Sequence, residues 1–263
     1  MAEVEAFEIL IVGGGKAGKT LAADLARSGR RVALVERGMI GGTCINVGCI
    51  PSKALIKSAA AARLVTRAAE FGIAVERWKT DMPAVLAYKR AVVAGMVDVN
   101  WNTLHGALGE NFILGDARFV APRTIDVRPA GGGPTRRLAG DKLFINLGAR
   151  AVLPDLPGLA DARPLTSESA LELGRLPEHL LVLGGGYIGV ELGQAFRHLG
   201  SRVTIVQRGP HLLPAEDVDV SEAVEFVLRA DGVEVLTDAH TLAVDGRSGE
   251  SVRLRVRVSD GER

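Results

Sequence analysis

The chain is poor in cysteine, in excess charge and in long apolar runs. Two cysteines in 263 residues are too few for a disulfide-stapled scaffold. A formal net charge of +1 gives no electrostatic footprint for nucleic acid or an anionic membrane surface. No apolar run approaches the roughly 20 residues of a membrane span, and the opening MAEVEAFEIL has acids where a signal peptide has Lys or Arg. We therefore expect a cytoplasmic protein that binds neither nucleic acid nor membrane.

The only two cysteines lie close together, as Cys44 and Cys49 of the segment GGTCINVGCIPSK from Gly41 to Lys53. A disulfide across so short a loop removes little chain entropy, so it would be a poor structural staple. Half of a zinc site is an alternative, but its other ligands would come from five histidines without paired spacing. Two inert buried thiols are a further alternative. The spacing favours a redox pair and predicts no metal site.

A dinucleotide-binding pattern precedes the cysteines. From Phe7 to Arg37 an apolar run ends in Gly13, Gly15 and Gly18, a helical pattern follows, and a second apolar run closes at Glu36. Such glycines permit a tight turn, close approach to a pyrophosphate and helix–strand packing, while the helix N-terminus attracts the phosphates. The acid accepts hydrogen bonds from ribose hydroxyls. We expect these residues to bind the first nucleotide.

The same segment also fits a competing motif. Gly13, Gly18, Lys19 and Thr20 spell GxxxxGKT, the phosphate-cradling loop of nucleoside triphosphatases. That function would need an acidic metal partner at the end of another apolar strand, and no such segment follows. The P-loop NTPase is therefore a remote alternative, which predicts Mg²⁺-ATP binding.

The pattern recurs from Leu180 to Arg208, where Gly184, Gly186 and Gly189 again stand between an apolar run and a helical pattern. Two such folds imply two nucleotides. The second repeat ends in Gln207 and Arg208 instead of an acid, and a guanidinium there could pair with a 2′-phosphate. This favours NADPH over NADH, unless Arg208 is a solvated loop charge.

With these motifs in view, the chain resembles the flavin-dependent pyridine nucleotide-disulfide oxidoreductases, and most of all their mercuric-reductase-like and reactive-chlorine-resistance branch. The resemblance runs through GGGKAGKTLA, GGTCINVGCIPSK, LFINLGARAVLPDLPGL and GGGYIGVELG. It implies an α/β fold with two Rossmann-like domains, parallel sheets, β-meanders and a helical excursion. We expect an incomplete FAD-binding domain over residues 1–149 and a truncated NAD(P)-binding domain over residues 150–263.

The family's chains are longer, so the resemblance implies that the C-terminal interface domain is absent here and that the full-length form is a homodimer. Helical periodicity predicts helices over Pro51 to Ala69 and Met82 to Leu104. From Phe112 to Leu147 the pattern changes and predicts short strands.

The resemblance also implies roles. The enzyme would pass electrons from NADPH or NADH through FAD to a Cys44–Cys49 disulfide. Cys44 would be the interchange thiol and Cys49 the thiol beside the flavin. The acceptor would be a small-molecule disulfide or a soft metal ion, Hg²⁺ or Cu²⁺. A non-catalytic flavin-binding or redox-sensing fragment is the alternative.

Further residues are carried over by position. Lys53 and Glu191 would form an ion pair beside the flavin, unless they are two surface charges. Tyr187 would cover the nicotinamide pocket, unless it is a packed helix residue. The remaining expected cofactor contacts are Gly42, Thr43, Gly148 and Ile188.

Overall fold

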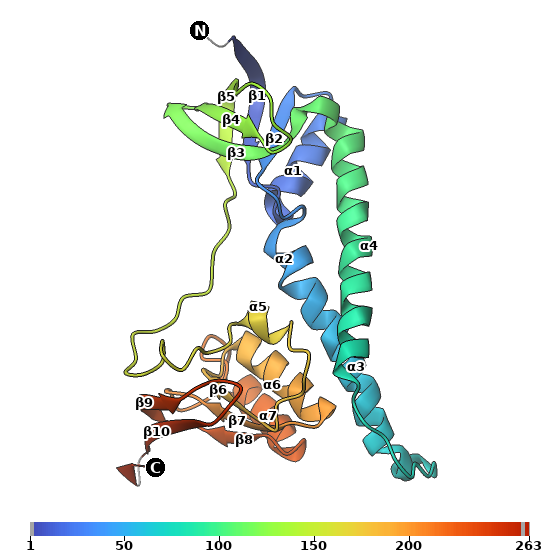
Figure 1. Ribbon diagram of the computed structural model, residues 1–263, viewed down its shortest axis with the longest axis vertical. Coiled ribbons are helices and arrows are strands. Elements are labelled where there is room, and N and C mark those ends of the chain that lie inside the picture. Colours follow the sequence, from blue (N-terminus) through green and yellow to red (C-terminus); the bar gives the residue numbers. More distant parts are fainter. Residues whose placement is uncertain (1–2, 259–260, 263) are drawn as a thin grey trace. The chain divides into compact units, whose positions relative to one another are not determined.

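The computed structural model describes residues 3–258 and 261–262 (Figure 1). The chain forms two compact units, each made of two separate stretches of sequence. The first consists of residues 1–51 and 90–150, and the second of residues 52–89 and 151–263. The predicted helical excursion is therefore divided between the units. Which nucleotide each unit binds stays a prediction.

Five strands of the first unit are hydrogen-bonded in a closed ring in the order β1-β2-β3-β4-β5. Parallel pairing joins β1 to both β2 and β5 and joins β2 to β3, whereas β3, β4 and β5 form an antiparallel meander. The elements are β1 (Val4–Val12), α1 (Lys16–Arg27), β2 (Val32–Glu36), α2 (Gly42–Asn46), β3 (Phe112–Ala121), β4 (Thr124–Pro129) and β5 (Arg136–Ile145), with the 3₁₀ turn η2 (Gly109–Asn111) before β3.

The alternation of side chains along β1 builds two cores in this unit. Leu10 belongs to one cluster with β-strand residues such as Ile125 and Leu138, which are fully buried. Ile9 and Ile11 point the other way and pack with Ala22 of α1 and with Leu104 of α4 (Met82–Leu108). Because successive strand residues face opposite sides, one short apolar strand serves both layers.

The second unit contains a three-stranded parallel sheet in the order β6-β7-β8 and an antiparallel sheet in the order β11-β10-β9. Helix α6 contacts β6 and β7, and α7 contacts β8. The elements are α3 (Cys49–Thr66), η1 (Ala68–Phe71), α5 (Ser167–Ala170), β6 (His179–Leu183), α6 (Tyr187–Leu199), β7 (Arg202–Val206), α7 (Val218–Ala230), β8 (Glu234–Leu236), β9 (His240–Gly246), β10 (Val252–Val258) and β11 (Gly261–Glu262). The predicted α/β fold with parallel sheets and meanders is confirmed.

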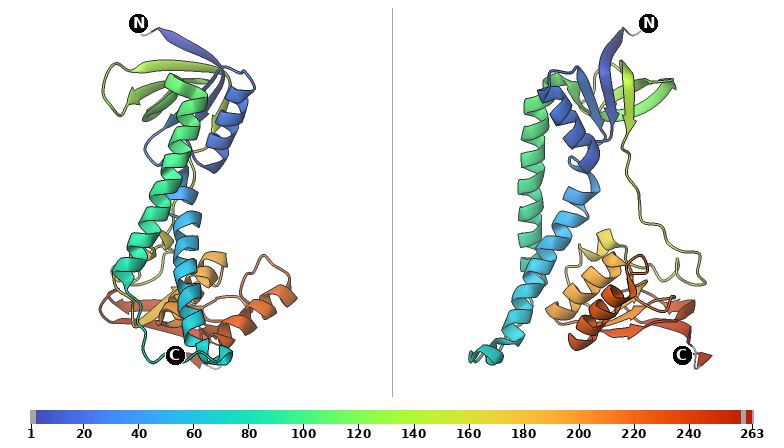
Figure 2. Two further views of the ribbon diagram at one scale, coloured as in Figure 1. Left: turned by 90° about the vertical axis from the view of Figure 1, so that its right-hand side faces the viewer. Right: turned by 180° about the vertical axis from the view of Figure 1, so that it is seen from behind.

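Helix α3 contributes to the core of the second unit. Its residues Leu55 and Ala59 are buried in one cluster with Leu192, Ala195 and Phe196 of α6. The two predicted long helices are both present, and Figure 2 shows α4 as one continuous helix. Helix α3 begins two residues earlier than expected and ends at Thr66, three residues before the predicted end. Helix α4 extends four residues further than expected, to Leu108. Over the described residues, no helix is both long enough and apolar enough to cross a membrane.

Candidate nucleotide and dithiol site

The first glycine loop joins β1 to α1 and is tied to the end of β2. The backbone N–H of Gly13 donates to the Val35 carbonyl at 2.8 Å, and that of Gly14 donates to Glu36 Oε2 at 2.7 Å. Gly15 is the N-cap of α1 and offers no capping side chain, so the first N–H groups of the helix remain for a ligand. A Cβ on Gly18 would lie 2.1 Å from the Gly13 carbonyl oxygen. Only glycine lets this helix pack so closely on the loop.

Glu36 is held against this loop by hydrogen bonds from backbone N–H groups. Besides the Gly14 contact, its Oε1 accepts from the N–H groups of Gly38 at 2.8 Å and Met39 at 3.0 Å. The residue is buried. The carboxylate is thus fixed at the tip of β2, where a ribose bound on the loop would meet it. Its role in binding stays a prediction.

Asn146 is a loop contact that the sequence did not single out. Its Nδ2 donates to the Gly13 carbonyl at 3.1 Å, and its backbone N–H donates to the Val12 carbonyl at 2.7 Å. The same amide would be 2.7 Å from a Cβ on Gly18. It directly follows β5, two residues before Gly148, whose φ is +75°. A single asparagine between two elements belongs to no spaced motif, so its contact with Gly13 is seen only in the folded structure.

The cysteine segment abuts the glycine loop. The N–H of Gly41 donates to the Gly14 carbonyl at 3.2 Å. A Cβ on Gly42, whose φ is +68°, would lie 2.5 Å from the Gly15 Cα. Glycine at both positions therefore lets α2 approach the start of α1, and Thr43 beside them is exposed. The predicted cofactor contacts Gly15, Gly42 and Thr43 are brought together.

The two cysteines occupy different helices. Cys44 is half-buried in α2, and Cys49 is exposed as the first residue of α3. Helix α3 thus begins at the second cysteine itself, two residues before the predicted start at Pro51.

Lys19 faces this region from α1. Burial lowers the pKa of Lys19, repulsion from Lys16 lowers it further, and the charge on Cys44 acts in the opposite direction. The Thr20 hydroxyl, which a P-loop would direct to Mg²⁺, donates instead to the Lys16 carbonyl at 2.9 Å. Within the described part of the chain, no group of three or more His, Cys, Asp or Glu residues could hold a metal ion. The Thr20 hydroxyl is thus engaged by α1 itself, at the position where the P-loop interpretation needs it for Mg²⁺.

The second glycine loop repeats the first almost bond for bond. The N–H of Gly184 donates to the Val206 carbonyl at 2.9 Å, and that of Gly185 to Gln207 Oε1 at 3.0 Å. A Cβ on Gly189 would lie 2.3 Å from the Gly184 carbonyl oxygen. The buried Gln207 therefore takes the structural place of Glu36. Gly186 caps α6 as Gly15 caps α1.

Three of the side chains predicted to contact the second nucleotide are exposed, whereas a fourth, that of Gln207, is buried. Tyr187 is 72% exposed, and Ile188 and Arg208 are also exposed. So large an exposed fraction does not fit a packed helix residue. The role of Tyr187 as a lid and that of Arg208 in selecting the nucleotide stay predictions.

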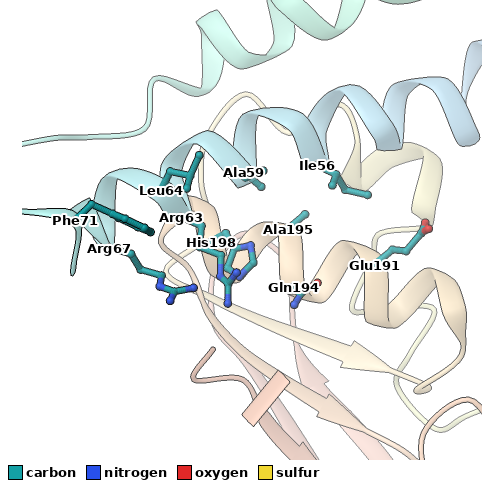
Figure 3. Close-up of a pocket in the computed structure, with 11 residues that line it drawn as sticks. Ile56, Ala59, Arg63, Leu64, Arg67, Phe71, Glu191, Gln194, Ala195 and His198 are labelled. Carbon is teal, nitrogen blue, oxygen red and sulfur yellow. The ribbon is translucent and has the colours of Figure 1, made fainter. Parts of the chain in front are cut away.

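Lys53 and Glu191 are both exposed, and the described residues show no ion pair between them. Their proposed pairing stays a prediction. Glu191 lines a cavity of about 450 Å³ between α3 and α6. In Figure 3 it lies at one end of the row of lining side chains, whereas Arg67 and Phe71 lie at the other.

Three of the lining residues, Arg63, Gln194 and His198, belong to a polar cluster centred on Asp231. Its carboxylate accepts from Arg63 at 2.7 Å and from Gln194 and His198 at 2.8 Å each. Burial acts to raise the pKa of Asp231, but hydrogen bonds from His198, Gln194 and Arg63 outweigh it and hold the pKa below its usual value. The cluster links α3 and α6 to the end of α7.

Comparisons of the sequence and of the fold with known proteins point to the same protein family. The sequence model for "Pyridine nucleotide-disulphide oxidoreductase" matches residues 7–263. The chain is 38% identical over 238 residues to the probable pyridine nucleotide-disulfide oxidoreductase RclA of Escherichia coli, covering 89% of this chain and 49% of that protein. It is 38% identical over 258 residues to mercuric reductase of Streptomyces lividans, covering 97% and 54%.

Dihydrolipoyl dehydrogenase of Pseudomonas aeruginosa is 37% identical over 265 residues, with coverage of 99% and 55%. Among solved structures, the HOCl-induced flavoprotein disulfide reductase RclA from Escherichia coli superimposes with a TM-score of 0.77 at 35% identity, over 98% of this chain and 54% of that chain. The chain spans about half the length of the curated relatives it matches.

Proposed function

The chain belongs to the pyridine nucleotide-disulphide oxidoreductase family, and from that premise we propose that it carries the redox centre of an FAD-dependent NAD(P)H oxidoreductase. In this proposal Cys44 and Cys49 alternate between dithiol and disulfide. The observation that carries the proposal is the contact of Gly42 with Gly15. It anchors the cysteine segment to the loop that would hold the first nucleotide.

The residues of the first unit fit FAD. The Gly13–Gly15 loop and the start of α1 would hold the pyrophosphate, because their backbone approaches without side chains and the helix end is electropositive. Glu36 would hold the ribose. Bound flavin would supply a two-electron relay between nicotinamide and sulfur. The second loop would hold the nicotinamide nucleotide through Gly184, Gly186 and Gly189, with Tyr187 and Ile188 beside it.

In this proposal the two thiols reduce an acceptor by thiol–disulfide exchange. The Cys44 thiolate attacks one sulfur of an acceptor disulfide, forms a mixed disulfide and expels the first thiol. Cys49 then attacks the Cys44 sulfur, which forms the Cys44–Cys49 disulfide and expels the second thiol. Two electrons leave the dithiol and reduce one acceptor disulfide to two thiols. Cys49 is exposed as the first residue of α3.

The proposal also specifies the electron acceptor and the preferred nicotinamide nucleotide. A small-molecule disulfide and a soft metal ion, Hg²⁺ or Cu²⁺, are the acceptor classes, since mercuric reductases and a Cu(II) complex of RclA are among the similar proteins. NADPH is preferred over NADH in this proposal because Gln207 replaces the ribose-binding acid and Arg208 follows it. We place the enzyme in the cytoplasm, where a catalytic dithiol is kept reducible, and propose a homodimer for the full-length form.

The visible spectrum of the purified chain tests the proposal. The protein is supplemented with FAD, desalted, and then treated anaerobically with NADPH. Retained flavin that bleaches or gains a long-wavelength band supports the oxidoreductase. Flavin that is retained but never reduced would instead support a non-catalytic flavin-binding module. Colourless protein would contradict FAD binding by this chain.

A further inference from the structure

Lys19 is a cation that the dinucleotide fold does not require. The two glycine motifs align position by position, from Gly13 on Gly184 to Gly18 on Gly189. At the next position the first repeat has Lys19 and the second has Val190. The repeat with the cysteine segment thus has lysine where its counterpart without cysteines has an apolar residue.

Lys19 and Cys44 both lie close in sequence to the contact between Gly15 and Gly42. The Lys19 N–H donates to the Gly15 carbonyl at 2.9 Å, so Lys19 lies one turn beyond Gly15 on α1. Gly15 abuts Gly42, and Cys44 follows two residues later on α2. Both side chains are half-buried, so solvent screens their interaction less than it screens a surface pair.

The electrostatics agree with this placement. Burial and the neighbouring Lys16 lower the pKa of Lys19, whereas the Cys44 charge raises it. A pairwise interaction is mutual, so a cation at Lys19 stabilises the thiolate of Cys44 to the same extent. The other titratable groups of this region are Lys16, whose charge acts on Lys19, Cys49 at the start of α3, and Glu36, whose oxygens accept from the backbone N–H groups of the first glycine loop and of Gly38 and Met39.

We propose that Lys19 is a positioning residue whose ammonium group keeps Cys44 in its nucleophilic thiolate form. This inference rests on the proposed dithiol function. In the attack on an acceptor disulfide, the Cys44 thiolate forms the new S–S bond without first losing a proton, and the expelled thiolate takes a proton from water. Lys19 changes neither the electron count nor the bonds formed.

Alkylation of Cys44 by iodoacetamide tests the proposal directly. Each variant carries Cys49→Ser, so that Cys44 is the one thiol that reacts, and intact mass gives the rate from pH 5 to pH 10. Lys19→Met should lower the rate at pH 7 roughly three- to tenfold and move the profile to higher pH, with the plateau at high pH unchanged. Lys19→Gln should behave alike, and Lys19→Arg should restore the rate.

Lys16→Met is the matched control, because it removes an exposed lysine from the same helix. It should not move the profile to higher pH, because removal of Lys16 only relieves the repulsion that lowers the pKa of Lys19. Equal profiles for Lys19→Met and Lys16→Met would overturn the proposal, as would a rate reduced equally at every pH, which indicates altered access. Alkylation needs neither flavin nor nicotinamide. A missing flavin reduction would therefore contradict the proposed function alone, and an unchanged profile would contradict the role of Lys19 alone.

Discussion

Replacing Gly18 by alanine should destabilise the first unit because the added methyl group would overlap neighbouring atoms. The new Cβ would lie 2.1 Å from the Gly13 carbonyl oxygen, 2.7 Å from Asn146 Nδ2 and 3.2 Å from Ile11 Cγ2. The first contact is about 1 Å short of van der Waals separation. Both nearest atoms are constrained, the carbonyl by the loop and the amide by its hydrogen bond. The helix must therefore move.

Overpacking of this kind costs about 1–3 kcal/mol, and the backbone neighbour argues for the upper end. Alanine returns roughly 0.5–1 kcal/mol through its better helix propensity. We expect a net loss of about 2 kcal/mol in the free energy of unfolding, measured by urea titration with far-ultraviolet circular dichroism. Retention of FAD after desalting should fall as well, since the loop moves with the helix.

Gly95 provides a control of opposite sign. It lies within α4, in the same unit, and an added Cβ there would have no described atom of a neighbouring element within 4 Å. Gly95→Ala should therefore stabilise by roughly 0.5–1 kcal/mol. Gly189→Ala, with its 2.3 Å contact in the second unit, should behave like Gly18→Ala. A stabilising Gly18→Ala would refute the packing argument for both loops.

Three further predictions concern the thiols, the nucleotide and the polar cluster. Cys44→Ser should leave Cys49 beside the flavin and give a long-wavelength absorption band that Cys49→Ser lacks; identical spectra would contradict the assigned roles. Arg208→Ala should reduce the ratio of kcat/KM for NADPH to that for NADH, and an unchanged ratio would remove Arg208 from the site. The depressed pKa of Asp231 contributes stability above its unfolded-state value of about 3.9 that is lost as pH falls through the lower folded-state value. Asp231→Asn should therefore flatten the acid limb of the unfolding curve and cost about 1–3 kcal/mol at pH 7.

The local parts of the site could be predicted from the sequence, and the long-range parts could not. Glycine spacing identified both loops, because each loop, its helix and the following strand are consecutive in the chain. Asn146 escaped notice because its partner Gly13 is 133 residues away (146 − 13). Helix α3 was predicted as a helix, but its periodicity does not predict that Leu55 and Ala59 pack on α6. Periodicity identifies a buried face but does not identify the partner of that face.

The closed ring of the first unit has a consequence for biosynthesis. Strand β1 pairs with β5 in a register that joins Val4 to Arg137 and Val12 to Ile145, a constant separation of 133 residues (137 − 4 and 145 − 12). A ribosome adding about 5–20 residues per second needs on the order of ten seconds to supply that partner. Throughout this interval one edge of an apolar strand is unpaired, which is a template for association with other chains. The nascent chain should therefore depend on chaperones until β5 emerges, and a translational pause before residue 136 should increase the aggregated fraction.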